Sequence, residues 1–355
     1  MYLLKKFSLL LMFISCFLIC GCGVSEENKK EEFLYVYNWS DYLDPKTIQI
    51  FEQETGIKVI YDEYDTNETM YPRISSGAMH YDVICPSDYM IQKMIYNNLI
   101  QPLDFEKLPN AKKYIGQKFF EQSWTFDYGN KYSVPYCWGT VGIMYNKNMV
   151  TEPVNSWKIL WNEKYKRKIL MQDSARDALM IPLKILGYSL NETEETIIIQ
   201  ARDMLIAQKP LVQAYVLDDA KDKLISGKAA LGVVYSGEAL MMMLKNKDLD
   251  FVVPKEGTNL WIDAWAIPKD AENVENAHKF IDFMCRPEIA VINFEHLGYS
   301  TPNIAVRDLE KNEEYKNSPV TFPSSEIYED QETYMYLGEE IEKFYNNQWR
   351  HVKGD

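Results

Sequence analysis

The chain contains few of the residues that build metal centres. Its four histidines (His80, His278, His296 and His351) are scattered, and no two of them sit at helical spacing. No cysteine and histidine cluster has the spacing of a metal site, and neither a P-loop nor a GxGxxG segment occurs. We therefore expect no metal and no cofactor, and a structural or surface role for each histidine.

Cysteine is also scarce once the start of the chain is set aside. Of the six cysteines, Cys85, Cys137 and Cys285 lie beyond the N-terminal apolar segment. An odd number leaves at least one free thiol or one intermolecular bond. We expect these three to be buried packing residues, so that disulfides do not hold the fold together.

Long apolar runs are confined to the N-terminus, where residues 7–19 follow a basic start. A run this short predicts a signal peptide, residues 1–21, rather than a membrane span. Its end, LICGC, resembles a bacterial lipobox, which implies a lipid on Cys22; the alternative is an ordinary signal peptide with incidental cysteines. Residues 22–32 would form a flexible tether, because the stretch after Cys22 is polar and charged.

Positive charge is in deficit. The chain has 38 lysines and arginines against 52 aspartates and glutamates, a net charge of -14. This balance disfavours nucleic acid as a partner and is compatible with a cationic ligand. A content of 46% hydrophobic and 25% charged residues is ordinary for a globular protein. The roughly 330 residues after the leader suggest two domains.

Strand-like segments repeatedly end in a polar turn that leads into a helix-like segment, an α/β pattern that implies parallel sheets. The expected strands cover residues 33–38, 58–64, 81–85, 132–136, 142–145, 169–172, 229–235 and 261–267. The expected helices cover residues 45–55, 69–76, 157–164, 274–284, 288–297 and 332–345, with others starting near residues 90 and 236. Ligands bind beyond the carboxyl ends of parallel strands, so a site is expected at the turns.

These turns place aromatic residues beside carboxylates. The residues concerned are Trp39, Asp41, Tyr42, Asp88, Tyr89, Asp173, Asp177, Tyr235, Glu238, Trp261 and Asp263, with Tyr299 as an aromatic alone. Each of them separately could be a packing residue, and Asp88, Asp173 and Glu238 could be helix N-caps. It is the repeated combination that indicates a binding site.

The combination suits a linear polyamine. Its ammonium groups need carboxylates, because a desolvated charge must be paired and hydrogen-bonded. Its methylene stems need apolar walls that tolerate positive charge, and aromatic faces supply about 0.5–2 kcal/mol per cation–π contact. A sugar would need mixed amide and guanidinium donors, and a free amino acid would also need a partner for its carboxylate.

Several motifs carry a resemblance to a known family. In chain order they are YNWSDY (37–42), TGIKVIYDEYDTNETMY (55–71), YDVICPSDYMIQKM (81–94), VPYCWGTVGIMYN (134–146), SWKILW (156–161), WIDAWAIP (261–268) and GYSTPN (298–303). In content and order they resemble the periplasmic spermidine/putrescine-binding proteins.

The resemblance implies an α/β type II periplasmic-binding fold, in which two lobes joined by crossing strands hold the ligand in a central cleft. Lobe one would comprise residues 33–137 and 262–308, and lobe two residues 138–261 and 309–355. The protein would close over a polyamine by hinge motion and deliver it to the permease of an ABC importer. We expect a monomer without enzymatic activity, anchored by lipid outside the cytoplasmic membrane, at the cell surface or in the periplasm.

The resemblance also implies the ligand-binding residues. Lobe one would contribute Trp39, Ser40, Asp41, Tyr42, Ser87 and Tyr89, lobe two Asp177, Tyr235 and Glu238, and the box would be completed by Trp261, Asp263 and Tyr299. Asp263 would take a terminal ammonium or the secondary amine.

The implied site mixes features of two branches of the family. Ser174 and Tyr235 stand where spermidine-preferring members have a carboxylate and a tryptophan. In contrast, WSDY and Glu238 resemble the putrescine-preferring members. The choice between spermidine and putrescine therefore stays open.

Two other classes remain as alternatives. An exported hydrolase with a carboxylate pair, such as a glycosidase, would use the abundant acids, although no single acid pair stands out. The same fold could instead hold ferric ion, which favours tyrosine pairs with histidine, or an anionic solute, which favours arginine. Arg176 is the one basic residue in the candidate turns.

Overall fold

The structure is a computed structural model that describes residues 32–216, 220–323 and 331–354. The chain divides into two compact units, residues 1–32 and 33–355, and the description below concerns the second unit. The predicted signal peptide and Cys22 lie outside the described residues. Among the helices described, none is long and apolar enough to cross a lipid bilayer.

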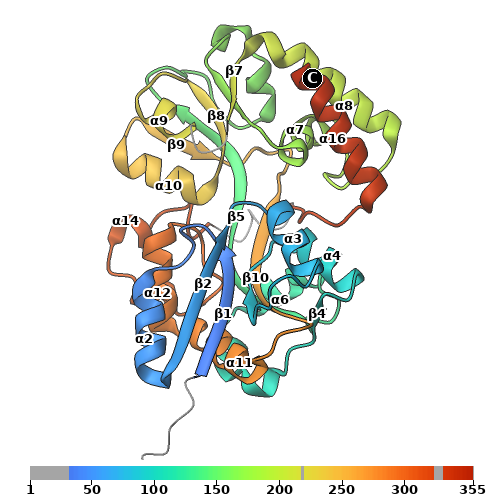
Figure 1. Ribbon diagram of the computed structural model, residues 1–355. Coiled ribbons are helices and arrows are strands. Elements are labelled where there is room, and N and C mark those ends of the chain that lie inside the picture. Colours follow the sequence, from blue (N-terminus) through green and yellow to red (C-terminus); the bar gives the residue numbers. More distant parts are fainter. Residues whose placement is uncertain (1–31, 217–219, 324–330, 355) are drawn as a thin grey trace, which may run out of the picture. The chain divides into compact units, whose positions relative to one another are not determined.

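One ten-stranded sheet forms the centre of this unit (Figure 1). Its strands follow the order β2-β1-β3-β10-β5-β8-β6-β7, with β4 paired to β10 and β9 paired to β5. The strands are β1 (Glu32–Trp39), β2 (Ile57–Tyr64), β3 (Val83–Ile84), β4 (Ile100–Gln101), β5 (Ser133–Asn146), β6 (Ile169–Gln172), β7 (Val212–Val216), β8 (Leu231–Tyr235), β9 (Leu249–Val252) and β10 (Leu260–Pro268).

Helices connect and cover the strands. They are α2 (Pro45–Thr55), α3 (Asn67–Ser75), α4 (Asp88–Tyr96), α5 (Pro109–Tyr114), α6 (Gln117–Ser123), α7 (Ala175–Leu186), α8 (Glu195–Gln208), α9 (Ala220–Ile225), α10 (Ser236–Lys245), α11 (Val274–Met284), α12 (Pro287–Leu297), α13 (Val306–Leu309), α14 (Glu313–Lys316) and α16 (Glu339–Lys353). Short 3-10 helices are η1 (Phe105–Lys107), η2 (Trp157–Trp161), η3 (Glu163–Tyr165) and η4 (Lys209–Leu211).

The predicted parallel pairing is right for the flanks of the sheet and wrong for its centre. β3 pairs parallel with β1, and β6 pairs parallel with both β7 and β8. The central strands β5 and β10 are antiparallel to each other, β10 is antiparallel to β3, and β5 is antiparallel to β8. The flanking strands alternate with helices, which is the connection that parallel pairing requires, whereas β5 and β10 carry the chain between the flanks.

Three apolar cores lie along these central strands. The first packs around β1, β3 and β10 and includes Trp265, and the second packs around β6, β8 and α7 and includes Trp157. The third includes Met144 of β5 and packs around α9, α10 and α12. β5 contributes residues to all three cores, and Figure 1 shows β5 in green paired with β10 in orange at the middle of the ribbon. The carboxyl ends of β3 and β8 both meet this pair, because Ser87 bridges to Asp263 and Tyr235 pairs with Val141.

Most of the expected helices and strands are confirmed. The helix over residues 45–55 forms as α2 and ends at Gly56, whose φ of 75° is the left-handed conformation that favours glycine. The helices expected over residues 274–284 and 288–297 form as α11 and α12. Cys85, Cys137 and Cys285 are free and buried, as predicted.

Three expectations about regular structure are wrong. Residues 132–136 and 142–145 belong to one continuous strand, β5. Gly139 lies within this strand. The Trp261 ring packs against it so closely that a Cβ would stand 2.5 Å from the ring, so a residue with a side chain does not fit without a shift. The helix expected over residues 157–164 forms as the 3-10 helices η2 and η3. The last helix begins at Glu339 rather than at residue 332, because the preceding segment runs beside the start of β10.

Candidate functional site

The predicted turns converge on the start of β10. Trp261 pairs with Gly139 of β5, and Asp263 pairs with Cys137. The register between β5 and β10 shifts immediately after Asp263, where Ser87 bridges to it from the turn before α4. The ends of β1, β3 and β8 thus meet around two side chains of one strand.

Asp263 is a buried carboxylate at the centre of this pairing. Its side chain is 4% exposed, and Oδ2 accepts a hydrogen bond from the Tyr42 hydroxyl at 2.5 Å. Its Oδ1 is buried and has no hydrogen-bond partner in the structure. Burial raises the pKa of Asp263 to about 6, although the neighbouring Ser87 and Tyr42 hydroxyls lower it. A buried anion with a vacant acceptor is costly until a cation or donor reaches it.

Aromatic rings surround this carboxylate. The Trp261 and Tyr299 rings meet edge to face with centroids 5.0 Å apart, and Tyr235 approaches Trp261 at 6.2 Å. Tyr42 lies 6.1 Å from both Tyr299 and Trp39. The indole N–H of Trp261 is buried and has no hydrogen-bond partner in the structure. The rings therefore form an apolar wall that contains one buried donor without a partner, on the same strand as Asp263.

Asp177 lies at the opposite end of the cluster, in the first turn of α7. It is 4% exposed, and each carboxylate oxygen accepts a hydroxyl: Tyr235 at 2.9 Å and Tyr334 at 3.0 Å. Sequence reasoning missed Tyr334, because the segment that contains it was expected to be helical.

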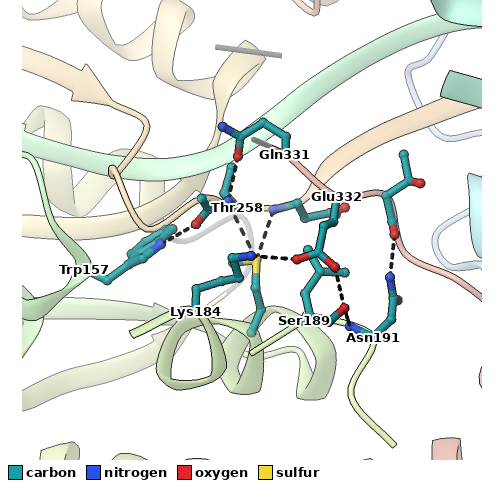
Figure 2. Close-up of polar contacts among 12 residues, drawn as sticks. Trp157, Lys184, Ser189, Asn191, Thr258, Gln331 and Glu332 are labelled. Atoms are coloured by element: carbon teal, nitrogen blue, oxygen red, sulfur yellow. Dashed lines mark hydrogen bonds and ion pairs between the residues drawn. The ribbon is translucent and has the colours of Figure 1, made fainter. Parts of the chain in front are cut away.

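The extended segment before α16 is held in place by polar contacts, shown in Figure 2. The backbone N–H of Thr258 donates to Gln331 Oε1 at 2.7 Å, and Lys184 pairs with Glu332 at 2.6 Å. The backbone N–H of Leu260 donates to the Glu332 carbonyl at 2.9 Å. These contacts fix the segment between α7 and β10, which brings Tyr334 to Asp177.

Some predicted residues lie at the edge of the cluster. Ser40 and Asp41 are exposed, and the Asp41 side chain, 90% exposed, pairs with His296 at 3.0 Å. Asp41 has a φ of 53°, which turns it away from the direction of β1. Asp173 accepts bonds from Trp349 and Lys353 of α16. The structure therefore does not bring Asp41 and Asp173 next to Asp263.

Two further predicted residues have partners of their own. The Tyr89 hydroxyl accepts from Asn67 at 3.0 Å and donates to Glu68 at 2.9 Å. Glu238, in the first turn of α10, pairs with Lys221 at 3.0 Å. Both side chains belong to turns that adjoin the cluster, but neither touches Asp263.

The alternative roles considered for the acids and for Arg176 do not hold. The N-cap positions are Ser87, Ser174 and Tyr235 rather than the carboxylates beside them. The Arg176 guanidinium donates to Asn191 at 2.8 Å and stacks 4.4 Å from the Tyr334 ring centre. The guanidinium of Arg176 is thus engaged by Asn191 and Tyr334.

The histidines take structural or surface positions, as predicted. His278 is buried, where Nε2 accepts the backbone N–H of Asp104 and Nδ1 contacts the Val274 carbonyl. His80 pairs with Asp270 at the surface. In the described part of the chain, no group of three histidine, cysteine or acidic side chains is placed to hold a metal ion.

Known proteins of similar sequence and structure share one function class. The spermidine/putrescine-binding periplasmic protein of Escherichia coli (strain K12) is 38% identical over 297 residues, which are 82% of this chain and 84% of that protein. The spermidine/putrescine ABC transporter substrate-binding protein PotD of Streptococcus pneumoniae is 41% identical, with a TM-score of 0.83 over 91% of this chain and 99% of that one. The Tp0655 (TpPotD) lipoprotein of Treponema pallidum is 26% identical, with a TM-score of 0.81 over 90% and 99%.

These relatives confirm the resemblance that the motifs indicated, and they confirm the two-lobe type II periplasmic-binding fold. The family of bacterial extracellular solute-binding proteins matches residues 46–323 of this chain. The chain therefore belongs to the family of bacterial extracellular solute-binding proteins.

Proposed function

We propose that this protein captures a linear polyamine, spermidine or putrescine, outside the cytoplasmic membrane and delivers it to an ABC importer. The observation that carries the proposal is the buried, unpartnered Oδ1 of Asp263 among aromatic rings. An ammonium group can pair with that oxygen while its methylene chain lies against the rings. The names of the relatives support the same ligand class and the same transporter class.

The proposed ligand-binding residues fall into two groups. Asp263, Trp261, Tyr42, Trp39, Ser87 and Tyr299 surround the vacant carboxylate oxygen, and Asp177 and Tyr235 form the opposite end. Ser40, Asp41, Tyr89 and Glu238 complete the proposed set at its edges, where closure of the lobes over a ligand would bring them into contact. The proposal does not choose between spermidine and putrescine.

The division into lobes is also a proposal. Lobe one would comprise residues 33–137 and 262–308, and lobe two residues 138–261 and 309–355. Support comes from the first and second apolar cores, which share β5 and are linked by the antiparallel pair of β5 and β10. Bending of these two strands would open and close the cleft. The protein would work as a monomer and without enzymatic activity.

Direct titration tests the proposed ligand class. Calorimetry of residues 33–355 with putrescine, spermidine and spermine should give a micromolar or tighter Kd, about -8 kcal/mol. The melting temperature should rise with polyamine by mass action, and salt should weaken binding less than it weakens an exposed ion pair. Ferric citrate and a panel of sugars serve as controls. If millimolar polyamine changes neither heat nor melting temperature, the proposed function is wrong.

The anchoring at Cys22 needs its own experiment. We propose that Cys22 carries lipid and holds the protein at the cell surface or in the periplasm; a relative described as a lipoprotein supports this. Cys22→Ser should abolish incorporation of labelled fatty acid and release the protein into the aqueous fraction. Unchanged labelling and membrane retention in that variant would refute lipidation at Cys22.

A further inference from the structure

Asp88 is a buried carboxylate beside the proposed site. It is the first residue of α4 and is 1% exposed. Its oxygens accept only backbone N–H groups, from Tyr89 at 2.7 Å and from Ile262 at 3.3 Å. No side chain in the described part of the chain forms an ion pair with it. The amino end of a helix favours a carboxylate, but that preference is met equally well by an exposed one.

The turn that carries Asp88 lies directly on β10. The Pro86 carbonyl accepts the backbone N–H of Ala264 at 3.1 Å, and Ser87 bridges to Asp263. Asp88 accepts the backbone N–H of Ile262, the residue between Trp261 and Asp263. Residues 86–88 therefore contact three successive residues of β10, 262–264. This is the part of β10 where Asp263 stands and where the pairing register with β5 shifts.

Asp88 and Asp263 form a buried pair of carboxyl groups that interact electrostatically. Desolvation raises the pKa of Asp88 above its ordinary range, and the neighbouring Asp263 raises it further. Arg176 exerts a smaller opposing effect, and its guanidinium is engaged by Asn191. Ionisation of both carboxyl groups is therefore unfavourable without a paired cation, and positive charge nearby favours it.

We propose that Asp88 is a positioning residue of the polyamine site, which holds β10 so that Trp261 and Asp263 face the ligand and which can supply a second negative charge once an ammonium is bound. This proposal rests on the proposed function. Part of the binding affinity would then come from attraction between the ammonium and the Asp88 carboxyl, which can ionise beside Asp263 once positive charge is present. A multiply charged amine would benefit more than a monoamine of the same length.

The structure supplies a matched control in Asp82. It is 2% exposed and also accepts backbone N–H groups, from Tyr35 at 2.9 Å and from Asn273 at 2.7 Å. A side-chain bond from Asn273 at 3.0 Å completes its contacts. Asp82 is therefore a buried carboxylate with a structural role that belongs to the first core, without contact to the proposed site.

Asp88→Asn and Asp82→Asn test the proposal in the protein of residues 33–355. Asp88→Asn keeps the shape and one carbonyl-type acceptor but removes the charge. It should weaken putrescine and spermidine binding roughly tenfold, in the range of charge pairs coupled at short distance. Its ligand-free melting temperature should be equal to or higher than that of the wild type. Asp82→Asn should lower the melting temperature and leave Kd within twofold.

A double variant separates an action through Asp263 from a general effect. If Asp88 acts through Asp263, then Asp88→Asn should cost less than about threefold in a background that already carries Asp263→Asn. A Kd for Asp88→Asn within twofold of the wild type overturns the proposal, and so does a full additive loss in the double variant. Absence of polyamine binding by the wild type itself would instead refute the proposed function.

Discussion

The two carboxylates at the ends of the cluster are equally buried but differently satisfied. Asp263 and Asp177 are each 4% exposed. Both oxygens of Asp177 accept tyrosine hydroxyls, whereas Asp263 accepts the Tyr42 hydroxyl on Oδ2, has Ser87 as a neighbour, and has no hydrogen-bond partner within bonding geometry at its buried Oδ1. Burial alone therefore does not identify a ligand-binding acid. The Asp263 end lacks a positive partner, and the Asp177 end is already satisfied without one.

Removal of the Asp263 charge should have the largest effect on binding. Asp263→Asn preserves the shape but leaves the ligand ammonium without its anion. Breaking a buried charge pair by removing one partner costs about 2–5 kcal/mol, which corresponds to at least roughly 30-fold in Kd. Calorimetry with putrescine and spermidine measures this loss.

Asp270→Asn is the control for that experiment. Asp270 lies beyond the end of β10 and pairs with His80 at the surface, where both side chains are well exposed. Such pairs contribute little, so affinity and melting temperature should stay at wild-type values. If Asp263→Asn loses stability but keeps its affinity, Asp263 only satisfies local donors and the contrast with Asp177 has no functional meaning.

The next largest effect should be the pH dependence of the unfolding free energy that Asp263 causes. The pKa of Asp263 is raised by burial from 3.8 to about 6. The folded protein therefore binds this proton more tightly than the unfolded chain, so the charged carboxylate destabilises the ligand-free fold above pH 6. The cost is about 3 kcal/mol, from a shift of roughly two units, and it is relieved as the pH falls toward 4.

The difference between wild type and Asp263→Asn isolates this group from all others. Without ligand, the variant should be more stable than the wild type at pH 7, and the difference should shrink between pH 6 and pH 4. Polyamine affinity of the wild type should fall over the same range, because the ammonium needs the ionised carboxylate. Denaturant melts and calorimetry at several pH values test both trends. A stability difference that does not change with pH would contradict them.

Tyr334→Phe should make Asp177 resemble Asp263, because one oxygen of the buried carboxylate loses its hydrogen-bond donor. The variant removes one of the two hydroxyls and leaves a buried carboxylate oxygen without a partner. The ligand-free protein should lose about 1–3 kcal/mol of unfolding free energy, the cost of an unsatisfied buried acceptor. Binding of a long polyamine should recover part of that loss if its far ammonium reaches Asp177.

Tyr345→Phe is the matched control, because its hydroxyl donates to the Glu192 carbonyl in the second core and not to a carboxylate. Both variants should lose stability. Only Tyr334→Phe should show a larger rise in melting temperature with spermidine than the wild type shows. Equal ligand-induced shifts in the two variants would mean that Asp177 lies beyond the reach of the ligand.

The sequence predicted those parts of the site that neighbouring residues form. It did not predict contacts between segments that are distant along the chain. Trp261 and Asp263 stand two residues apart on a strand, so their shared face followed from strand geometry. Tyr334 reaches Asp177 only because residues before α16 run extended, against a periodic pattern that favoured a helix. Gly338, with a φ of 84°, was the available signal for that break. Asp88 looked like an ordinary helix-start acid, since burial cannot be inferred from a turn sequence.

The motif around residues 37–42 shows the other limit of sequence reasoning. Trp39 and Tyr42 join the aromatic wall, but Ser40 and Asp41 between them are exposed. The positive φ of Asp41 reverses the local direction of the chain. The Asp41 side chain contacts His296, which is distant in sequence. Residue type and order therefore identified the motif without fixing the direction of each side chain.

Of the variants considered, Cys137→Ser should change polyamine affinity the least. The Cys137 sulfur lies 2.9 Å from the Tyr42 hydroxyl, which also donates to Asp263. Burial raises the pKa of this thiol, and the charge of Asp263 raises it further, so it stays neutral at pH 7 and reacts slowly with thiol reagents. A serine hydroxyl can keep the contact with Tyr42, so Kd should change less than about threefold, or about 0.6 kcal/mol. A loss as large as that of Asp263→Asn would mean that the thiol, and not the carboxylate alone, sets the binding strength at this end.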